Sequence, residues 1–327
     1  MDISYFTSVV TGIIFGIGAI GLSMIYKYLK FPDFTTIISL SIGSAVMAVV
    51  SPVSILLAIF LGIVAGGFLG FITYLQIRYL EVNEMLAGII TSVGAVSIVY
   101  LITDGQAIVP SNEKIIYIFH QILSPEFSWW NIVKIGIVGI LISFLVSSIF
   151  NTRYGLSILG MLGSKNYVKN RHRNKEKATI LILLLGNGII SFAGSLLTIQ
   201  AGNFNISGTP DFLVTALSGY VISTFLINIL SGEKSFYHFQ KESKPSGRYC
   251  FKIIYLLQTP LNKNDEEPIK IFWFLNFIIL GTVIVNWIFQ YIDSNYSDNN
   301  RVSYLYKAGV FLFFIFLGKI EKLISSK

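Results

Sequence analysis

Cysteine is almost missing from this chain of 327 residues, in which Cys250 is the single thiol. One cysteine permits no disulfide within the chain and argues against a metal site built on thiolates. Histidine is also rare: His120, His172 and His238 stand far apart, without the HxxxH spacing or the paired carboxylates of a metal site. The sequence therefore predicts no bound metal ion and no cofactor.

Charged residues are scarce as well, since they make up 13% of the chain, whereas 54% of its residues are hydrophobic. This composition is far from that of a soluble domain and predicts an all-α, polytopic membrane protein embedded in the lipid bilayer. Nine apolar stretches can form helices of about 20 residues, enough to cross about 30 Å of hydrocarbon. Those stretches are residues 5–26, 33–50, 53–75, 85–103, 131–150, 178–199, 212–230, 271–290 and 303–319. The second and third nearly meet at Ser51 and Pro52, so a broken or re-entrant element is an alternative there.

No charged side chain is expected near the centre of these stretches, because Glu84, Lys134, Asp211 and Lys307 all lie at their edges. Charges deep in a membrane usually mark ion or proton paths, so this pattern argues against a proton-coupled transporter. A sodium-coupled secondary transporter, which binds its ion with carbonyl and hydroxyl groups, stays open as the alternative function. A membrane enzyme acting on lipid would need a cluster of His, Asp or Glu near one interface, and none is visible.

A nucleotide-binding loop is absent from the sequence too. The run SGEKS at 231–235 resembles a fragment of a phosphate loop, but its glycine and lysine are not adjacent and no GxxxxGK pattern stands upstream. The chain is therefore not expected to be an enzyme. If ATP drives it, a partner chain must bind and hydrolyse the nucleotide.

Basic residues are divided unequally between the predicted loops. With the N-terminus outside and the C-terminus in the cytoplasm, four of the 24 lysines and arginines face outward, which leaves 20 facing inward. The four are Lys114, Lys134, Arg301 and Lys307. Short cytoplasmic loops of membrane proteins carry such an excess, so the net charge of +7 reflects topology and predicts no nucleic-acid partner.

Small residues recur at helical spacing in three of the stretches, where they let helix backbones approach closely. The glycines that we expect at such contacts are Gly12, Gly16, Gly62, Gly66, Gly70, Gly186, Gly188 and Gly194. The last three belong to the run GNGIISFAGSL at 186–196, in which one helical face is small and polar. That face should meet protein or a polar path, since lipid gains nothing from it.

Uncharged polar side chains within or beside the same stretches are candidates for a path through the membrane. They are Asn83, Thr91, Ser92, Asn187 and Ser191. An asparagine inside hydrocarbon either bonds to a neighbouring helix or contacts a polar solute that is neutral or zwitterionic. The sequence leaves both roles open for Asn187.

Several runs, in order over most of the chain, resemble a known transporter family. They are FPDFTTIISLSIGSAV at 31–46, NEMLAGIITSVGAVSIVYLIT at 83–103, NTRYGL at 151–156 and LGNGIISFAGSLLTIQAGNF at 185–204. Together they resemble the permease subunits of ABC importers of the ribose and branched-chain amino acid class, and most of all its amino-acid, tryptophan-like branch. Two features depart from that pattern. STFLIN at 223–228 replaces a Gly-Glu pair, and Glu84 and Met85 stand where glycine and a small aliphatic residue are usual.

The resemblance implies a transport subunit in the cytoplasmic (inner) membrane of a bacterium, with an amino acid or a related polar molecule as its solute. It also implies three partners: a cytoplasmic ATP-binding subunit, a second permease copy or paralogue, and an extracytoplasmic solute-binding protein. We interpret residues 1–327 as one permease domain with a cytoplasmic coupling loop at 151–177 and a long basic cytoplasmic loop at 231–270. By resemblance, the residues that couple to the ATPase are Tyr154, Gly155, Leu156, Gly160 and Gly163.

Overall fold

The computed structural model describes residues 3–29, 33–111, 129–152, 172–206, 209–231, 266–295 and 309–310. Within these ranges the chain forms long helices and two short strands. In chain order they are α1 (Ile3–Leu29), α2 (Thr35–Val50), α3 (Ile55–Tyr79), α4 (Glu84–Ile102), β1 (Ile108–Pro110), α6 (Trp129–Asn151), α9 (His172–Ala201), β2 (Asn203–Asn205), α10 (Thr209–Ser231) and α12 (Glu266–Asn295). The helical class that the composition predicts is therefore confirmed for the described part of the chain.

Six of these helices contain a stretch that is long and apolar enough to cross a membrane. The stretches are Phe6–Tyr26, Ile55–Tyr79, Glu84–Ile102, Ile132–Phe150, Glu176–Ala201 and Phe272–Ser294. The apolar stretches of α2 and α10 are shorter, at Thr35–Val50 and Asp211–Leu226. The chain is thus a polytopic integral membrane protein. Nine spans remain a prediction, and the last predicted stretch, 303–319, lies outside the described residues except for Gly309 and Val310.

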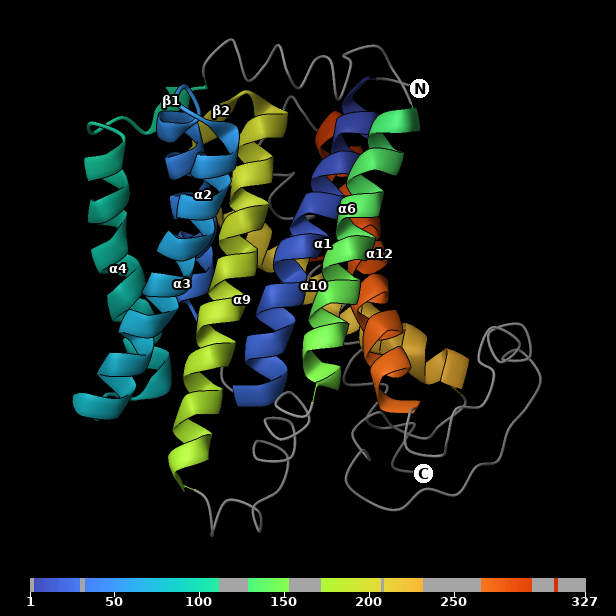
Figure 1. Ribbon diagram of the computed structural model, residues 1–327. Helices are drawn as coiled ribbons and strands as arrows, with labels where there is room; N and C mark the ends of the chain where they lie inside the picture. Colours follow the sequence, from blue (N-terminus) through green and yellow to red (C-terminus); the bar gives the residue numbers. More distant parts are fainter. Residues whose placement is uncertain are drawn as a thin grey trace.

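The helices stand side by side in a bundle with α1 and α9 at its centre (Figure 1). α9 packs against α1, α2 and α3, whereas α1 also packs against α6, α10 and α12. α4 lies at one edge of the bundle, against α2 and α3, and α6 lies at the other edge. The two strands and the N-terminus lie at the same end of the bundle, which we call the strand end (Figure 1).

Burial follows the position of each helix in the bundle. Ile14, Ile17 and Ile20 of α1 are fully buried, as are Ile182 and Ile190 of α9. α3, α4 and α6 instead expose many large apolar side chains. Such surfaces suit lipid, because the tails of a bilayer are as apolar as leucine. The residues that hold the structure together are therefore concentrated around α1 and α9.

α2 is a short, buried helix that begins near the middle of α9. The hydroxyl group of Thr35, in its first turn, donates to Oδ1 of Asn187, which lies midway along the apolar stretch of α9 (3.4 Å). Of the 16 residues of α2, 13 are buried. Residues 51–54 then lead the chain back into α3, so the close approach of the second and third predicted spans is a turn between two separate helices.

α9 begins at His172, six residues before the start that hydropathy predicts. Its first turns are polar, and Glu176 there pairs with Arg78 at the end of α3 (2.8 Å between Oε1 and Nη2). Hydropathy marks only the part of a helix that suits hydrocarbon, and it misses polar turns that extend beyond it. Residues 172–177 of the predicted coupling loop are therefore helical, and 153–171 lie outside the described residues.

Two short strands, which the sequence analysis did not predict, join the ends of α4 and α9. β1 and β2 are antiparallel, and Val109 pairs with Phe204, whose side chain is fully buried. The hydroxyl of Ser111 donates to the carbonyl of Gly202 (2.7 Å). Gly202 has a φ of 71°, a left-handed conformation that lets the chain leave α9 and enter β2 at once.

Candidate functional site

A buried line of polar side chains connects α2, α3 and α9, and we call it the polar seam. Its members are Asp33, Thr35, Ser39, Ser44, Asn187, Ser191, Ser195 and Thr198, all of them buried. The second polar region is a cavity at the strand end. The seam contains Asn187 and Ser191, the two predicted path residues that are buried most deeply.

Asp33, just before α2, places a carboxyl group inside the seam and is only 2% exposed. Its Oδ1 accepts a hydrogen bond from the backbone N–H of Thr35 (3.0 Å), and its Oδ2 accepts one from Nδ2 of Asn187 (3.2 Å). The sequence analysis used Asp33 only as part of a family resemblance. A signal was present, since an Asp directly before an apolar run is typical of a helix start.

Asn187 is the hub of the seam. Its Oδ1 accepts hydrogen bonds from the hydroxyl groups of Ser39 (2.8 Å) and Thr35 (3.4 Å). Its Nδ2 donates to Asp33 and also to the carbonyl of Leu183, one turn earlier in α9 (3.1 Å). A primary amide offers two donors and two acceptor positions, so protein groups satisfy all of them here.

Serine hydroxyl groups continue the seam toward the strand end by bonding to backbone carbonyls of neighbouring helices. Ser191 donates to Gly62 (2.6 Å) and Ser195 donates to Gly43 (3.1 Å). In the opposite direction, Ser44 of α2 donates to the carbonyl of Gly194 in α9 (2.8 Å). These bonds require helix backbones that lie closer together than large side chains allow.

Glycines on α3 create that closeness. Gly62, Gly66 and Gly70 all face α9. A Cβ atom on Gly62 would lie 2.8 Å from Oγ of Ser195, and one on Gly70 would lie 2.9 Å from Nδ2 of Asn187. Atoms do not approach each other so closely without a shift of the backbone or the side chain, so these positions hold no residue larger than glycine in this arrangement.

The other predicted glycines lie at contacts of α1 and α9. On Gly12 and Gly16 of α1, a Cβ would lie 2.8 Å and 2.7 Å from backbone Cα atoms of α12. The glycines of α9 face three different neighbours: Gly186 faces α1, Gly194 faces α2, and Gly188 meets Ile63 of α3 at an ordinary 3.4 Å. The small residues of the run GNGIISFAGSL therefore meet protein on several sides.

The predicted path residues of α4 lie in three different settings. Asn83 is exposed and caps α4, its side chain accepting from the backbone N–H of Met85 (3.0 Å). Thr91 is buried and bonds to the hydroxyl of Thr73 in α3 (3.2 Å). Ser92 donates to the carbonyl of Ile89 in its own helix (2.8 Å). These three do not converge with Asn187 and Ser191 on one space, and their role in translocation stays a prediction.

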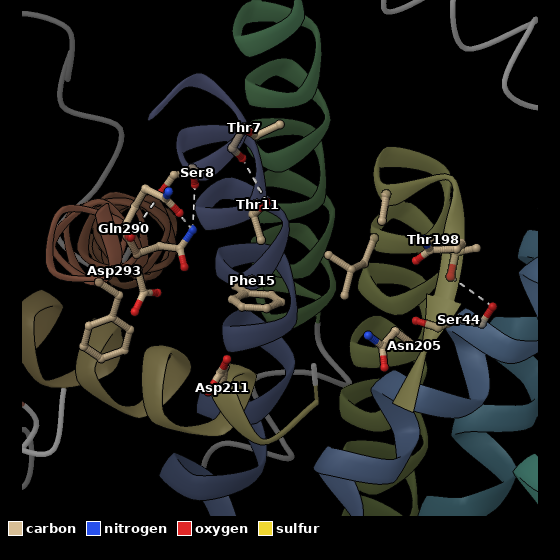
Figure 2. Close-up of a pocket in the computed structure, with 15 residues that line it drawn as sticks. Thr7, Ser8, Thr11, Phe15, Ser44, Thr198, Asn205, Asp211, Gln290 and Asp293 are labelled. Carbon is tan, nitrogen blue, oxygen red and sulfur yellow. Dashed lines mark hydrogen bonds between the residues drawn. The ribbon is translucent and has the colours of Figure 1, made fainter. Parts of the chain in front are cut away.

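The cavity at the strand end has a volume of about 430 Å³ and lies between α1, α9, α10 and α12 (Figure 2). Most of its lining residues have hydroxyl, amide or carboxylate side chains, and apolar atoms, including two phenylalanine rings, line the rest. The lining includes Thr11, Phe15, Asn205, Asp211, Phe289 and Asp293. Ligand pockets commonly have about 300–1,000 Å³, so this space is large enough for a small solute.

None of the five predicted path residues lines this cavity. A signal for it exists in the sequence of α12, where Asn286, Gln290 and Asp293 stand at i, i+4 and i+7 in an apolar helix. From the sequence, Asp211 was interpreted only as a charge at the edge of a span. The cavity is built from distant parts of the chain. The spacing of polar residues along α12 therefore could not reveal that they line the same cavity as Asp211.

Metal ligation has no visible basis in the part of the chain that the structure describes, where no three His, Cys, Asp or Glu side chains are grouped to hold an ion. The predicted coupling residues fall outside the described ranges. They are Tyr154, Gly155, Leu156, Gly160 and Gly163.

Comparison with known proteins gives two matches. Residues 4–317 match the model of a family described as the permease component of branched-chain amino acid transport systems. A curated protein of Clostridioides difficile (strain R20291), named "Tyrosine transport system permease protein", is 25% identical over 221 residues, which cover 65% of this chain and 70% of that protein. No solved structure matches the chain.

Proposed function

The chain belongs to the family of permease components of branched-chain amino acid transport systems, and on this premise we propose that it is the membrane subunit of an ATP-driven ABC importer. It forms the path by which a small polar solute, an amino acid or a related molecule, crosses the bilayer. The observation that supports this most is the family match over residues 4–317, because it spans nearly the whole chain.

The proposed orientation places the strand end outside the cell and the C-terminus in the cytoplasm. Arg78 and Glu176 pair at the opposite end of the bundle, and Glu176 is next in sequence to the basic loop that follows α6. Basic loops remain on the cytoplasmic side, so this end of the bundle faces inward. With the last predicted stretch included, the chain crosses the cytoplasmic membrane of a bacterium nine times.

The partners in this proposal are a cytoplasmic ATP-binding subunit, a second permease copy or paralogue, and an extracytoplasmic solute-binding protein. In this proposal the segment that contacts the ATPase begins at Tyr154, where an apolar run of sequence with glycines is followed by basic residues. Gly155 and Leu156 are at the centre of this contact. The permease itself supplies no nucleotide site and alternates between outward- and inward-facing states.

The cavity at the strand end is the outward opening of the path in this proposal. The predicted path residues Thr91, Asn187 and Ser191 lie apart from it, in contacts between helices that are closed here. They contact solute only if those helices separate during the transport cycle.

Co-purification tests the proposal. The tagged permease is isolated from its native membrane in mild detergent, and mass spectrometry measures the identity and copy number of every associated chain. We expect an ATPase with a phosphate loop at about one copy per permease, and we expect Gly155→Asp with Leu156→Asp to remove it. Gln106→Asp, an exposed substitution at the strand end, is the matched control that keeps the ATPase. Intact permease without any ATPase in several detergents would contradict the proposal and favour an ion-coupled transporter.

A further inference from the structure

The two carboxylates of the strand-end cavity come from different helices. Asp211 belongs to the first turn of α10, and Asp293 belongs to the last turns of α12. Figure 2 shows both on the side of the cavity that α10 and α12 form, while Thr198, Ser44 and Asn205 lie on the other side. The cavity therefore has an acidic wall and a neutral wall of hydroxyl and amide groups.

Phenylalanine rings add to the acidic wall. Phe15 of α1 lies between the two walls in Figure 2, and Phe289 lies one helical turn before Asp293. The face of an aromatic ring attracts cations, and its carbon atoms also accept the apolar part of a ligand. No lysine, arginine or histidine is among the lining residues that the structure describes. The described lining thus has two acidic side chains on one side and uncharged polar side chains on the other.

We propose that this cavity is a binding site for a solute that carries a protonated amine. The ammonium group lies at Asp211 and Asp293, and the rest of the solute extends past Phe15 toward the amide and hydroxyl wall. An amino acid fits this arrangement, because its carboxylate then meets neutral hydrogen-bond donors such as the side-chain amide of Asn203. A solute whose only charge is negative does not fit, since the two carboxylates repel it.

The inference rests on the proposed function, because it assumes that the strand end faces outward and that the chain carries a solute. It goes further by assigning part of the recognition to the permease itself. Discrimination between solutes would then not depend on an extracytoplasmic binding protein alone.

A reporter cysteine in the neutral wall tests the charge of the cavity without any ligand. Cys250→Ser removes the only natural thiol, and Asn205→Cys adds one that is exposed and lines the cavity. The purified full chain is treated with a cationic methanethiosulfonate (trimethylammonium) or an anionic one (sulfonate). We expect the cationic reagent to react about tenfold faster, because each carboxylate attracts one reagent and repels the other. Ala107→Cys, exposed at the same end but outside the lining, is the matched control without this preference.

Asp211→Asn and Asp293→Asn, each in the reporter background, assign the preference to its source. Each substitution keeps the size of the side chain and removes one charge, so we expect the ratio of the two reaction rates to fall about threefold per substitution. An unchanged unfolding temperature shows that both variants keep their fold. In the reporter that keeps both Asp211 and Asp293, equal rates with the two reagents would contradict the proposal of an acidic cavity. A cysteine at position 205 that does not react with either reagent would also contradict it.

Three related probes then test the class of ligand: tyrosine, tyramine and 3-(4-hydroxyphenyl)propionate. Tyramine lacks the carboxylate of tyrosine, and the propionate lacks its amine. Tyrosine and tyramine should slow the labelling of Asn205→Cys, whereas the propionate should not, and Asp211→Asn should abolish the protection. Protection by the propionate, or by none of the three, would overturn the amine site even if the chain co-purifies with an ATPase. If the two amines protect the cysteine but no ATPase co-purifies with the chain, the amine site is supported and the proposal of an ABC importer is refuted.

Discussion

Asn187 answers a question that its position in the sequence raises, namely why an asparagine lies in the middle of an apolar helix. Its amide bonds to Asp33, Thr35 and Ser39 around the start of α2, so it joins α9 to a neighbouring helix. Polar bonds of this kind are a common way to hold helices together in a bilayer. The geometry thus favours a structural role, which a substitution can separate from contact with solute.

Replacing Asn187 with leucine should destabilise the protein. Asn187→Leu leaves the carboxyl group of Asp33 and the hydroxyl of Ser39 buried without their partner, and each unsatisfied group costs about 1–3 kcal/mol. The unfolding temperature of the purified protein in detergent measures the effect. Ser92→Ala is the control, because Ser92 bonds only within its own helix and its loss should change the temperature little.

Two further outcomes separate the roles of Asn187. Exchanging the two groups, with Asp33→Asn and Asn187→Asp in one chain, keeps a carboxyl next to an amide and should recover part of the lost stability. An unfolding temperature that stays the same in Asn187→Leu while transport disappears would instead assign the residue to the solute path.

Single residues are also where the sequence predicted least. The path candidates were chosen because they are polar within apolar stretches, but polarity does not tell whether a neighbouring helix satisfies the group. Asp33 was not chosen as a candidate from the sequence. Its burial and its hydrogen bond with Asn187 of α9 are visible only in the three-dimensional structure. Asp211 and Asp293 share a cavity although 82 positions separate them along the chain.

Among the helices, the contact between α3 and α9 depends on the absence of side chains. A Cβ on Gly66 would lie 2.7 Å from the carbonyl oxygen of Asn187. Gly66→Ala should therefore lower the free energy of unfolding by about 1–3 kcal/mol, the usual cost of overpacking. Gly94→Ala in α4 is a matched control, because nothing lies within 4 Å of its Cβ position. Chemical unfolding in detergent compares the two, and equal effects would show that α3 and α9 are not closely packed there.

The helices themselves were largely predictable, because runs of apolar residues identify hydrocarbon-length segments without knowledge of their neighbours. Eight of the predicted stretches coincide with described helices, with limits that differ by several residues. Hydropathy could not predict how deep in the bundle each helix begins. α2 looks like an ordinary span in sequence, but it begins beside Asn187, near the middle of α9. The short pairing of β1 with β2 lacks a long alternating pattern and was also missed.

At the scale of the whole molecule, the distribution of basic residues predicts how the chain is oriented in the membrane, and cysteine labelling tests that prediction. Natural Cys250 lies in the predicted cytoplasmic loop, so a maleimide that cannot cross membranes should label it only after the cells are made permeable. Ala107→Cys in a Cys250→Ser background lies at the strand end and should be labelled in intact cells. The reverse labelling pattern would show that the protein has the opposite orientation in the membrane, with the cavity at the cytoplasmic face.

Family membership was also predictable from sequence, since motifs scattered over the chain resembled the permeases of ABC importers and the family match confirms that resemblance. It rests on runs such as NTRYGL at 151–156 and LGNGIISFAGSLLTIQAGNF at 185–204. Motifs of this kind retain the overall function of a family while the solute changes. In our proposal the chemistry of the cavity, and not the family motifs, limits the solute class.

Solute uptake into proteoliposomes tests the importer most directly. The permease is reconstituted with the ATPase and the solute-binding protein from its own membrane, and the accumulation of a mixture of radiolabelled amino acids is followed. We predict uptake that needs ATP on the ATPase side, stops when a Walker lysine of the ATPase is replaced, and continues when ionophores abolish all ion gradients. Uptake by the permease alone that follows a sodium or proton gradient and ignores ATP would contradict it.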